Sequence, residues 1–464
     1  MFTIKVKTND KELSGTFYEQ VLLSVALEQL GLPQDKPCGG KGSCKKCRVT
    51  ANGKEVLSCQ TYVNSDTLIE YVIKEQTLQG MTDGFMPAFE KKPLITDGYG
   101  MAVDIGTTTV AGYLYQFPQC RQIKCVAVPN PQAVYGADVI SRIEHAGKGG
   151  LCQLQEEICN CIRNLAEDYP IEKYVITGNT TMLHLLTGKD PSGIAISPYT
   201  PQTLFGGWYK NAYLPPCISA YVGADITTAI LASGMLKDKT SLLVDIGTNG
   251  EMVLWHNGTL TCCSTAAGPA LEGAGITHGT CAVGGAINKV FIKDGAVEYT
   301  TIENLPAVGL CGSGLIDTIA CLLQLGVIDE TGYMEQTFPI GDSGICLTPE
   351  DVRQVQLAKS AIRSGIDTLL NCNSLCYDDI DTFYLAGGFG SYLDIRNGAI
   401  LKLIPDAFLP KTMVIGNAAG TGSIMLLHNK DFLKEAEYIA SIAKTEELSS
   451  NHFFMKKYIE NMLF

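Results

Sequence analysis

The sequence predicts a small α+β domain followed by a duplicated α/β domain. Three observations support this fold class. Residues 2–73 read as two strands, a helix and further strands, with a cysteine-rich loop after the helix. An apolar run that ends in Asp-Ile-Gly-Thr occurs twice, at residues 100–109 and 241–250. The two copies are 141 residues apart, which indicates a duplicated domain rather than a solenoid, whose repeats are about 20–50 residues long.

The order of elements near the N-terminus predicts a β-grasp fold. Strand-like patterns fall at residues 2–7, 11–17, 48–59 and 66–73, and a helical pattern falls at about 17–30. Thr16 and Glu19 have the spacing of a capping box at the start of this helix, and Gly31 and Pro33 end it.

Changes in pattern along the chain predict the domain boundaries. Residues 76–98 lack clear periodicity and contain Gly80, Gly84, Pro87 and Pro93, so we expect a linker there. The predicted units are an N-terminal domain at 1–75, the linker at 76–98, two halves of the duplicated domain at 99–238 and 239–430, and an exposed helical segment at 431–464.

Composition and charge exclude several classes of protein. Hydrophobic residues make up 46% and charged residues 18% of the 464 residues, as in a globular chain with a large core. The formal net charge of −13 argues against nucleic-acid binding, which requires a basic patch. The sequence shows no signal-peptide pattern and no run of about 18 apolar residues, so we expect a soluble, cytoplasmic protein without membrane contact and with reduced thiols.

Four of the 18 cysteines form a cluster: Cys38, Cys44, Cys47 and Cys59. Plant-type [2Fe–2S] clusters are held by three cysteine thiolates on one loop and a fourth further along the chain. The glycines between Cys38 and Cys44 let the backbone curl around such a cluster. Structural zinc is also bound by four cysteines, usually as two closely spaced pairs. Here only one closely spaced pair, Cys44 and Cys47, is present among the four. The pattern therefore favours a [2Fe–2S] cluster over the alternative, zinc.

This stretch resembles the plant- and adrenodoxin-type ferredoxins in its CGGKGSCKKC motif and the downstream LSCQT. The gap before Cys59 is shorter than in those ferredoxins, so the intervening hairpin must be trimmed. Basic residues near the loop form either a solvated rim or a docking patch for an acidic redox partner: Lys36, Lys41, Lys45, Lys46 and Arg48.

Each Asp-Ile-Gly-Thr turn suits the binding of phosphate. Glycine permits close backbone approach, threonine hydroxyls and backbone N–H groups donate to phosphate oxygens, and aspartate can hold Mg²⁺ through water. Two glycine-rich segments follow apolar strands further on. Residues 384–390 suit a backbone that passes flush against an adenine or ribose, and residues 415–422 open a helix with small residues suited to a hinge.

In this order of motifs, residues 97–428 resemble the sugar-kinase/actin/Hsp70 ATPase superfamily. The resemblance implies an actin-like, ribonuclease-H-like fold that binds ATP with Mg²⁺ and closes two lobes over the nucleotide. It implies catalytic roles for Asp104 and Asp245. The nucleotide would be bound by Gly106, Thr107, Thr108, Gly247, Thr248, Asn249, Gly387 and Gly388.

The two domains together resemble the reductive activators of corrinoid enzymes along nearly the whole chain. The phrases that carry the resemblance are NPQAVYGADVISRI at 130–143, TGNTTMLHLL at 177–186, DIGTNGE at 245–251, STAAGPALEGAGI at 264–276 and GLCGSGLID at 309–317. The resemblance implies an ATP-hydrolysing activase that passes an electron from its [2Fe–2S] cluster to an inactive Co(II) corrinoid protein and so regenerates Co(I) for methyl transfer. Its partners would be a corrinoid protein of a methyltransferase system and an upstream low-potential electron donor; a homodimer is left open.

Longer members of that family carry an extra domain where this chain has only about 25 residues, and others carry C-terminal Cys-x-x-Cys clusters that residues 377–464 lack. Three alternatives remain: a small-metabolite kinase with its substrate pocket at 188–220, an activator of hydroxyacyl-CoA dehydratases, and an ATP-dependent redox sensor. The loop at 264–275 is either an internal turn that closes the ATP site or a surface that places Ser264 or Glu272 near the cobalt.

Overall fold

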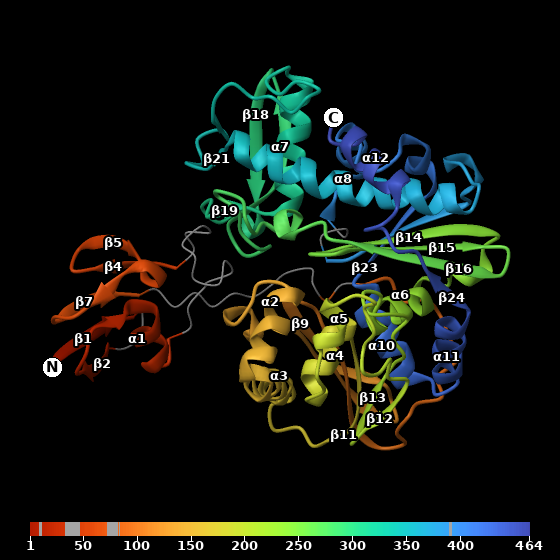
Figure 1. The fold of residues 1–464 in the computed structure, drawn as a ribbon, viewed down its shortest axis with the longest axis horizontal. Helices are drawn as coiled ribbons and strands as arrows, with labels where there is room; N and C mark the ends of the chain where they lie inside the picture. Colours follow the sequence, from red (N-terminus) through yellow and green to blue (C-terminus); the bar gives the residue numbers. More distant parts are fainter. Residues whose placement is uncertain (9–11, 33–46, 72–81, 83, 389–391) are drawn as a thin grey trace.

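A computed structural model of the chain describes residues 1–8, 12–32, 47–71, 82, 84–388 and 392–464. Figure 1 shows an N-terminal sheet at the left and two larger lobes, one above the other, at the right. The lower lobe contains α3 (Leu151–Ala166) and α4 (Thr180–Thr187), and the upper lobe contains α7 (Gly312–Gln324) and α8 (Pro349–Cys372).

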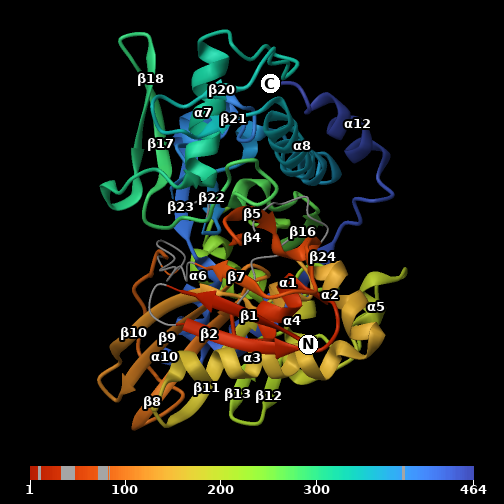
Figure 2. The same ribbon diagram turned by 90° about the vertical axis from the view of Figure 1, so that its left-hand side faces the viewer.

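The N-terminal unit is a mixed sheet with one helix packed on it (Figure 2). Its strands are β1 (Phe2–Lys7), β2 (Glu12–Phe17), β4 (Arg48–Ala51), β5 (Lys54–Leu57) and β7 (Thr67–Glu70), in the order β2-β1-β7-β4-β5 with β1 and β7 parallel. Helix α1 (Leu23–Gln29) buries Leu23 and Leu27 in one core with Ile4 and Ile69 of the sheet. This is the strand, strand, helix, strand order that the sequence predicted.

Helix α1 begins later than the pattern at residues 17–30 indicated. Val21 and Leu22 form strand β3 and pair with β6 (Tyr62–Val63), which keeps them extended. Leu22 precedes the helix and makes no side-chain cap, so the predicted capping box of Thr16 and Glu19 is wrong. A long-range strand pair therefore overrides a local helix signal.

The two lobes repeat one topology, which confirms the duplication inferred from the sequence. The first sheet runs β10 (Arg121–Pro129), β9 (Thr109–Phe117), β8 (Gly98–Ile105), β11 (Ile171–Gly178), β13 (Ala212–Leu214) and β12 (Gly207–Tyr209). The second runs β16 (Thr259–Thr265), β15 (Gly250–His256), β14 (Thr240–Ile246), β22 (Thr382–Ala386) and β23 (Thr412–Gly416), with β24 (Ala443–Thr445) at the β16 edge. In the first sheet β8 pairs antiparallel with β9 and parallel with β11. In the second sheet β14 pairs in the same way, antiparallel with β15 and parallel with β22.

Two small-residue helices join the lobes. Helices α6 (Ala224–Ser233) and α10 (Ala418–His428) share a core with residues of both β8 and β14. They approach so closely that a Cβ built on Gly422 would lie 2.0 Å from the carbonyl oxygen of Thr228. The small residues of the 415–422 segment are thus explained by tight helix packing between the lobes.

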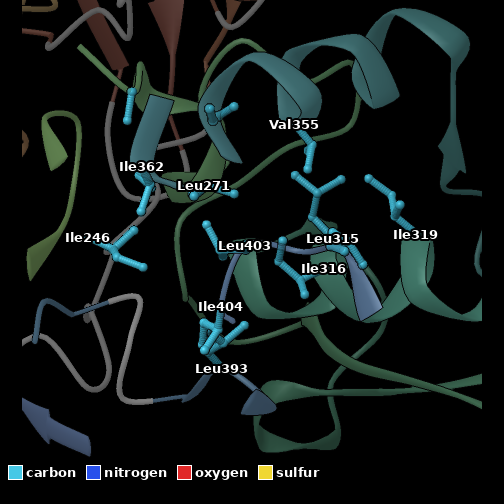
Figure 3. Packing of buried hydrophobic residues seen from close by; sticks show 14 of the residues in the cluster. Ile246, Leu271, Leu315, Ile316, Ile319, Val355, Ile362, Leu393, Leu403 and Ile404 are labelled. Atoms are coloured by element: carbon cyan, nitrogen blue, oxygen red, sulfur yellow. The ribbon is translucent and has the colours of Figure 1, made fainter. Parts of the chain in front are cut away.

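The upper lobe has its own large core. Figure 3 shows Leu315, Ile316 and Ile319 of α7 packed with Val355 and Ile362 of α8, and Leu271 of a short helical turn reaches the same cluster. Short strands border this core: β17 (Ala286–Lys293), β18 (Ala296–Thr301), β19 (Gly309–Leu310), β20 (Phe338–Pro339) and β21 (Cys346–Leu347). The remaining α-helices are α2 (Val139–His145), α5 (Ser192–Ala195), α9 (Ile395–Ile400), α11 (Phe432–Ile442) and α12 (His452–Glu460).

Two predicted segments are more tightly packed than expected. The described part of the linker follows α10, where the backbone N–H groups of Lys92 and Leu94 donate to the carbonyls of His428 and Leu427 at 2.9 and 3.1 Å. The segment at 431–464 is helical in part, but it is not simply exposed. It adds β24 to the second sheet, and Phe454 and Phe464 are buried in the upper core. The sequence pattern missed this because apolar residues in the segment do not show which distant elements they pack against.

Candidate functional site

The two Asp-Ile-Gly-Thr turns face each other across a cleft between the lobes. In each turn the glycine N–H closes a tight loop: Gly106 N–H donates to the carbonyl of Thr109 at 2.9 Å, and Gly247 N–H to that of Asn249 at 3.0 Å. All ten residues predicted for the nucleotide site line this one cleft: Asp104, Gly106, Thr107, Thr108, Asp245, Gly247, Thr248, Asn249, Gly387 and Gly388. None of residues 188–220, the predicted substrate pocket of a kinase, is among the residues described as lining it.

A single carboxylate bridges the two turns. The hydroxyls of Thr108 and Thr248 lie 3.3 Å apart, and both donate to Oε2 of Glu272, at 3.0 and 2.7 Å. Thr108 belongs to the first lobe and Thr248 to the second, so this contact ties the lobes together at the centre of the cleft.

Carboxylates dominate the electrostatics of the cleft. Loss of hydration raises the pKa of Asp104 to about 6, although Asn417 donates to its Oδ2 at 3.0 Å. Loss of hydration, followed by the charge of Asp104, raises the pKa of Asp245 to about 7. Three more carboxyls line the cleft, those of Asp225, Glu251 and Glu272. The same loss of hydration is the main cause that raises their pKa values. Repulsion between neighbouring carboxylates adds to the effect at Asp225, Asp245 and Glu251, so the cleft attracts positive charge.

The carbonyls of the first turn are all held from behind by one segment. Asn130 donates from Nδ2 to the carbonyl of Gly106 at 2.8 Å and from its backbone N–H to that of Thr108 at 2.8 Å. Arg142 donates from its guanidinium to the carbonyl of Thr107 at 2.5 Å. Arg142 is fully buried, and loss of hydration lowers its pKa to about 10, so it stays charged at neutral pH. A fixed positive charge behind the turn favours an anion in front of it.

Glycine at position 387 is required by the second turn. Gly387 has φ +94°, and a Cβ there would lie 2.5 Å from the carbonyl oxygen of Ile246 and 2.7 Å from Oδ1 of Asp245. The backbone after β22 therefore passes close to the second aspartate, which explains the glycine without any contact to an adenine or ribose.

Two of the four predicted cluster cysteines fall within the described residues and lie together. Cys47 precedes β4, Cys59 lies in the turn after β5, and both are buried with their Sγ atoms 3.1 Å apart. The carbonyl of Cys47 also accepts from the N–H of Ser58 at 2.9 Å, which holds the two segments together. A pair of shielded thiols fits a metal cluster. Cys38 and Cys44 lie outside the described residues, as do four of the five basic residues; Arg48 pairs with Glu55 at 2.9 Å.

Comparison with known proteins now gives the family. The model for the middle region of RACo matches residues 99–238, and the model for the C-terminal domain of RACo, the ASKHA domain, matches residues 239–464. The chain belongs to the family of reductive activators of corrinoid enzymes. The prediction made from its motifs is thereby confirmed at the level of the family.

Curated and solved relatives of this activator cover most of its length. It is 29% identical to the corrinoid activation enzyme RamQ of Eubacterium limosum, with 96% of each chain covered. It is 26% identical to the [Co(II) methylated amine-specific corrinoid protein] reductase of Methanosarcina barkeri, over 77% of this chain and 74% of the other. A solved reductive activator for corrinoid,iron-sulfur protein aligns with 28% identity and a TM-score of 0.75, covering 100% of this chain and 98% of the other.

Sequence reasoning about this activator missed several cleft residues. Asn179 donates to the Thr107 hydroxyl at 3.2 Å, and Asn417 holds Asp104. Asp225 opens α6 and Glu251 lies on β15. Asn130, Arg142, Asn179 and Glu251 lie inside the quoted family phrases, but no local pattern shows that they converge. In the part of the activator that the structure describes, no helix is long and apolar enough to cross a membrane.

The structure corrects the suggestion that Glu272 faces a corrinoid. Its carboxylate points into the cleft between the two turns and not away from the protein. Ser264 is half-buried on β16, where its hydroxyl lies 3.5 Å from Oε1 of Glu251. Of the two interpretations of the loop at 264–275, the internal turn that closes the cleft is the one that fits.

Proposed function

We propose that this activator uses ATP to drive the transfer of one electron from a [2Fe–2S] cluster to an inactive Co(II) corrinoid protein, regenerating Co(I) for methyl transfer. The observation that carries the proposal is the pair of Asp-Ile-Gly-Thr turns, one from each lobe, that face one cleft rich in carboxylates. Family membership supplies the corrinoid partner, because the related proteins are named as corrinoid activation enzymes and corrinoid protein reductases.

In this proposal ATP binds between the lobes. Asp104 and Asp245 hold Mg²⁺ through water, and the charge of the cation offsets the loss of hydration that raises the pKa values of both carboxyls. The backbone N–H groups and hydroxyls of the two turns donate to the phosphates. Asn130 and Arg142 orient the first turn for this task by holding its carbonyls on the opposite side.

The N-terminal unit holds the cluster in this proposal, through Cys38, Cys44, Cys47 and Cys59. A plant-type cluster supplies an electron at about −400 mV. The Co(II)/Co(I) couple is lower, so the transfer is uphill, and each 59 mV of deficit costs about 1.4 kcal/mol for one electron. Closure of the lobes over ATP offsets this deficit if the closed and open forms bind the two cobalt states with different affinity. An upstream low-potential electron donor is required to reduce the cluster again after each transfer.

Two sets of variants separate the redox and nucleotide halves of the proposal. Anaerobically purified protein should contain about two irons and two sulfides per chain. Cys47→Ala and Cys59→Ala should lose this iron, whereas Cys152→Ala, at an exposed position on α3, should keep it. Asp245→Ala should lose ATP hydrolysis and keep the visible spectrum of the cluster.

Three results would contradict the proposal. One zinc per chain in place of iron would remove the redox function. Unchanged electron delivery by Asp245→Ala would remove the coupling to ATP. Rapid phosphorylation of a small acceptor without any protein partner would favour a metabolite kinase instead.

A further inference from the structure

The carboxylate of Glu272 accepts hydrogen bonds from the same groups that would donate to a phosphate bound between the two turns. Its Oε2 accepts from the hydroxyls of Thr108 and Thr248, at 3.0 and 2.7 Å, and the backbone of Thr248 also donates to this carboxylate. Its Oε1 lies 3.6 Å from the position of a Cβ on Gly247, so the carboxylate rests against the second turn. One anionic group is thus bound by donors from both lobes.

The segment that carries Glu272 is well fixed on one side. Glu272 ends a short helical turn, η5 (Pro269–Glu272), and Leu271 beside it is 1% exposed in the core of the upper lobe (Figure 3). Gly268 N–H donates to the carbonyl of Thr248 at 2.9 Å, which joins η5 to the second turn.

Glycines flank the turn on both sides. Gly268 and Gly273 have φ of +80° and +79°, where other residues are strained. A Cβ on Gly268 would meet nothing within 4 Å, whereas one on Gly273 would lie 2.2 Å from the carbonyl oxygen of Thr280. The backbone is therefore held at both ends of the turn, by the bond from Gly268 to Thr248 and by the packing of Gly273 on Thr280, so a change at Glu272 is coupled to the second turn and to the residues that follow η5.

A threonine hydroxyl has one hydrogen and donates to one acceptor at a time. A phosphate that accepts from Thr108 and Thr248 must take both hydrogens from Glu272. Two anions in a cleft with little water also repel each other strongly. The carboxylate and the phosphate therefore exclude one another at this position.

We propose that Glu272 is a placeholder for a phosphate group of the nucleotide, and that it ties the lobes together until the nucleotide displaces it. This inference rests on the proposed binding of ATP in the cleft. Displacement moves η5 and the residues after it, so the loop at 266–276 reports the state of the cleft to the surface of the upper lobe. Glu272 is then a positioning residue whose effect on nucleotide affinity is negative, unlike that of a ligand.

The test is the affinity of the full-length protein for a non-hydrolysable ATP analogue with Mg²⁺, measured by calorimetry. Glu272→Ala frees both hydroxyls, and we expect it to bind the analogue at least about tenfold more tightly than the native protein, which corresponds to 1.4 kcal/mol. Glu272→Gln loses the charge but keeps an oxygen that accepts from both threonines, so we expect an intermediate affinity.

Glu251→Gln is the matched control for charge, because Glu251 lines the same cleft and contacts Ser264 instead of Thr108 or Thr248. Equal tightening in Glu251→Gln and in both Glu272 variants would reduce the effect to charge and overturn the inference. Weaker binding by Glu272→Ala would overturn it as well, because a ligand or a structural residue gives that sign. No binding by the native protein would contradict the proposed function itself.

Hydrogen exchange gives a second readout that does not depend on affinity. In the native protein, exchange of the amides at 266–276 should change when the analogue is added. In Glu272→Ala these amides should already exchange as in the nucleotide-bound native protein, with no further change on binding. If the exchange of these amides in the native protein is the same with and without the analogue, the proposed displacement is overturned.

Discussion

Asp104 should be costly to the stability of the fold, so replacing it with asparagine should stabilise the protein while it impairs ATP hydrolysis. The side chain lies in the cleft at the end of β8, and Asn417 donates to its Oδ2 at 3.0 Å. An asparagine can accept the same hydrogen bond through its amide oxygen. The substitution therefore removes the charge and keeps the contact.

The magnitude follows from the pKa of Asp104. Loss of hydration raises it from 3.8 to about 6, and each pKa unit corresponds to about 1.36 kcal/mol, so ionised Asp104 costs the fold about 3 kcal/mol. Between the two pKa values the folded state binds more protons than the unfolded state, so stability falls as pH rises through this window and is constant above it. The advantage of Asp104→Asn should be about 3 kcal/mol at pH 7.5 and roughly half of that at pH 5.

Thermal unfolding at several pH values, without nucleotide or Mg²⁺, measures this advantage. Asp378→Asn is the control, because Asp378 is exposed in the same lobe as the second turn and its charge is already hydrated. Asp104→Asn should unfold at a higher temperature than the native protein at pH 7.5, and the difference should shrink as the pH is lowered to 5. A lower unfolding temperature at pH 7.5, or a difference that does not depend on pH, would refute the electrostatic reasoning.

Three further substitutions test other parts of the structure. Arg142→Met should weaken nucleotide binding about tenfold and destabilise the lower lobe, because the buried carbonyls of Thr107 and Gly136 lose their donor. Calorimetry measures the first effect and thermal unfolding the second. The control Arg163→Met, on the exposed face of α3, should show neither effect. Gly422→Ala should lower stability by about 1–3 kcal/mol, because its Cβ would overlap the carbonyl of Thr228, whereas Gly147→Ala, with nothing within 4 Å, should be tolerated in the same denaturation assay. Burial lowers the pKa of the Lys359 amine from 10.5 to about 7, so the stability of the native protein should rise between pH 7 and 10. Lys359→Met should flatten this rise. An unfolding temperature that depends on pH in the same way in both proteins over that range would contradict this.

The sequence alone predicted the parts of the site that are local. Each Asp-Ile-Gly-Thr turn follows directly on an apolar strand, so its residue types and its position at a strand end were readable without a structure. The resemblance to the ATPase superfamily then implied that two lobes close over one nucleotide, and the structure brings all ten of those residues together in one cleft.

Long-range contacts account for what the sequence did not reveal. Arg142 lies 35 positions from the Thr107 carbonyl that it binds, and Glu272 lies 164 positions from Thr108. Neither contact leaves a periodic signal. The early start predicted for α1 was wrong for the same reason, because Leu22 is kept extended by its pairing with Tyr62, 40 residues further along the chain. Local chemistry was predictable, and the partners that orient it were not.

The most direct test of the central claim is the spectrum of the corrinoid in a single turnover. Reduced protein with its cluster is mixed with a Co(II) corrinoid protein, and the absorbance of Co(I) is followed with MgATP, with MgADP and without nucleotide. We predict that Co(I) appears with MgATP, that it does not accumulate with MgADP or without nucleotide, and that Cys59→Ala produces none. Formation of Co(I) at the same rate and yield without ATP, or no Co(I) from protein shown to carry a reduced cluster, would contradict the account.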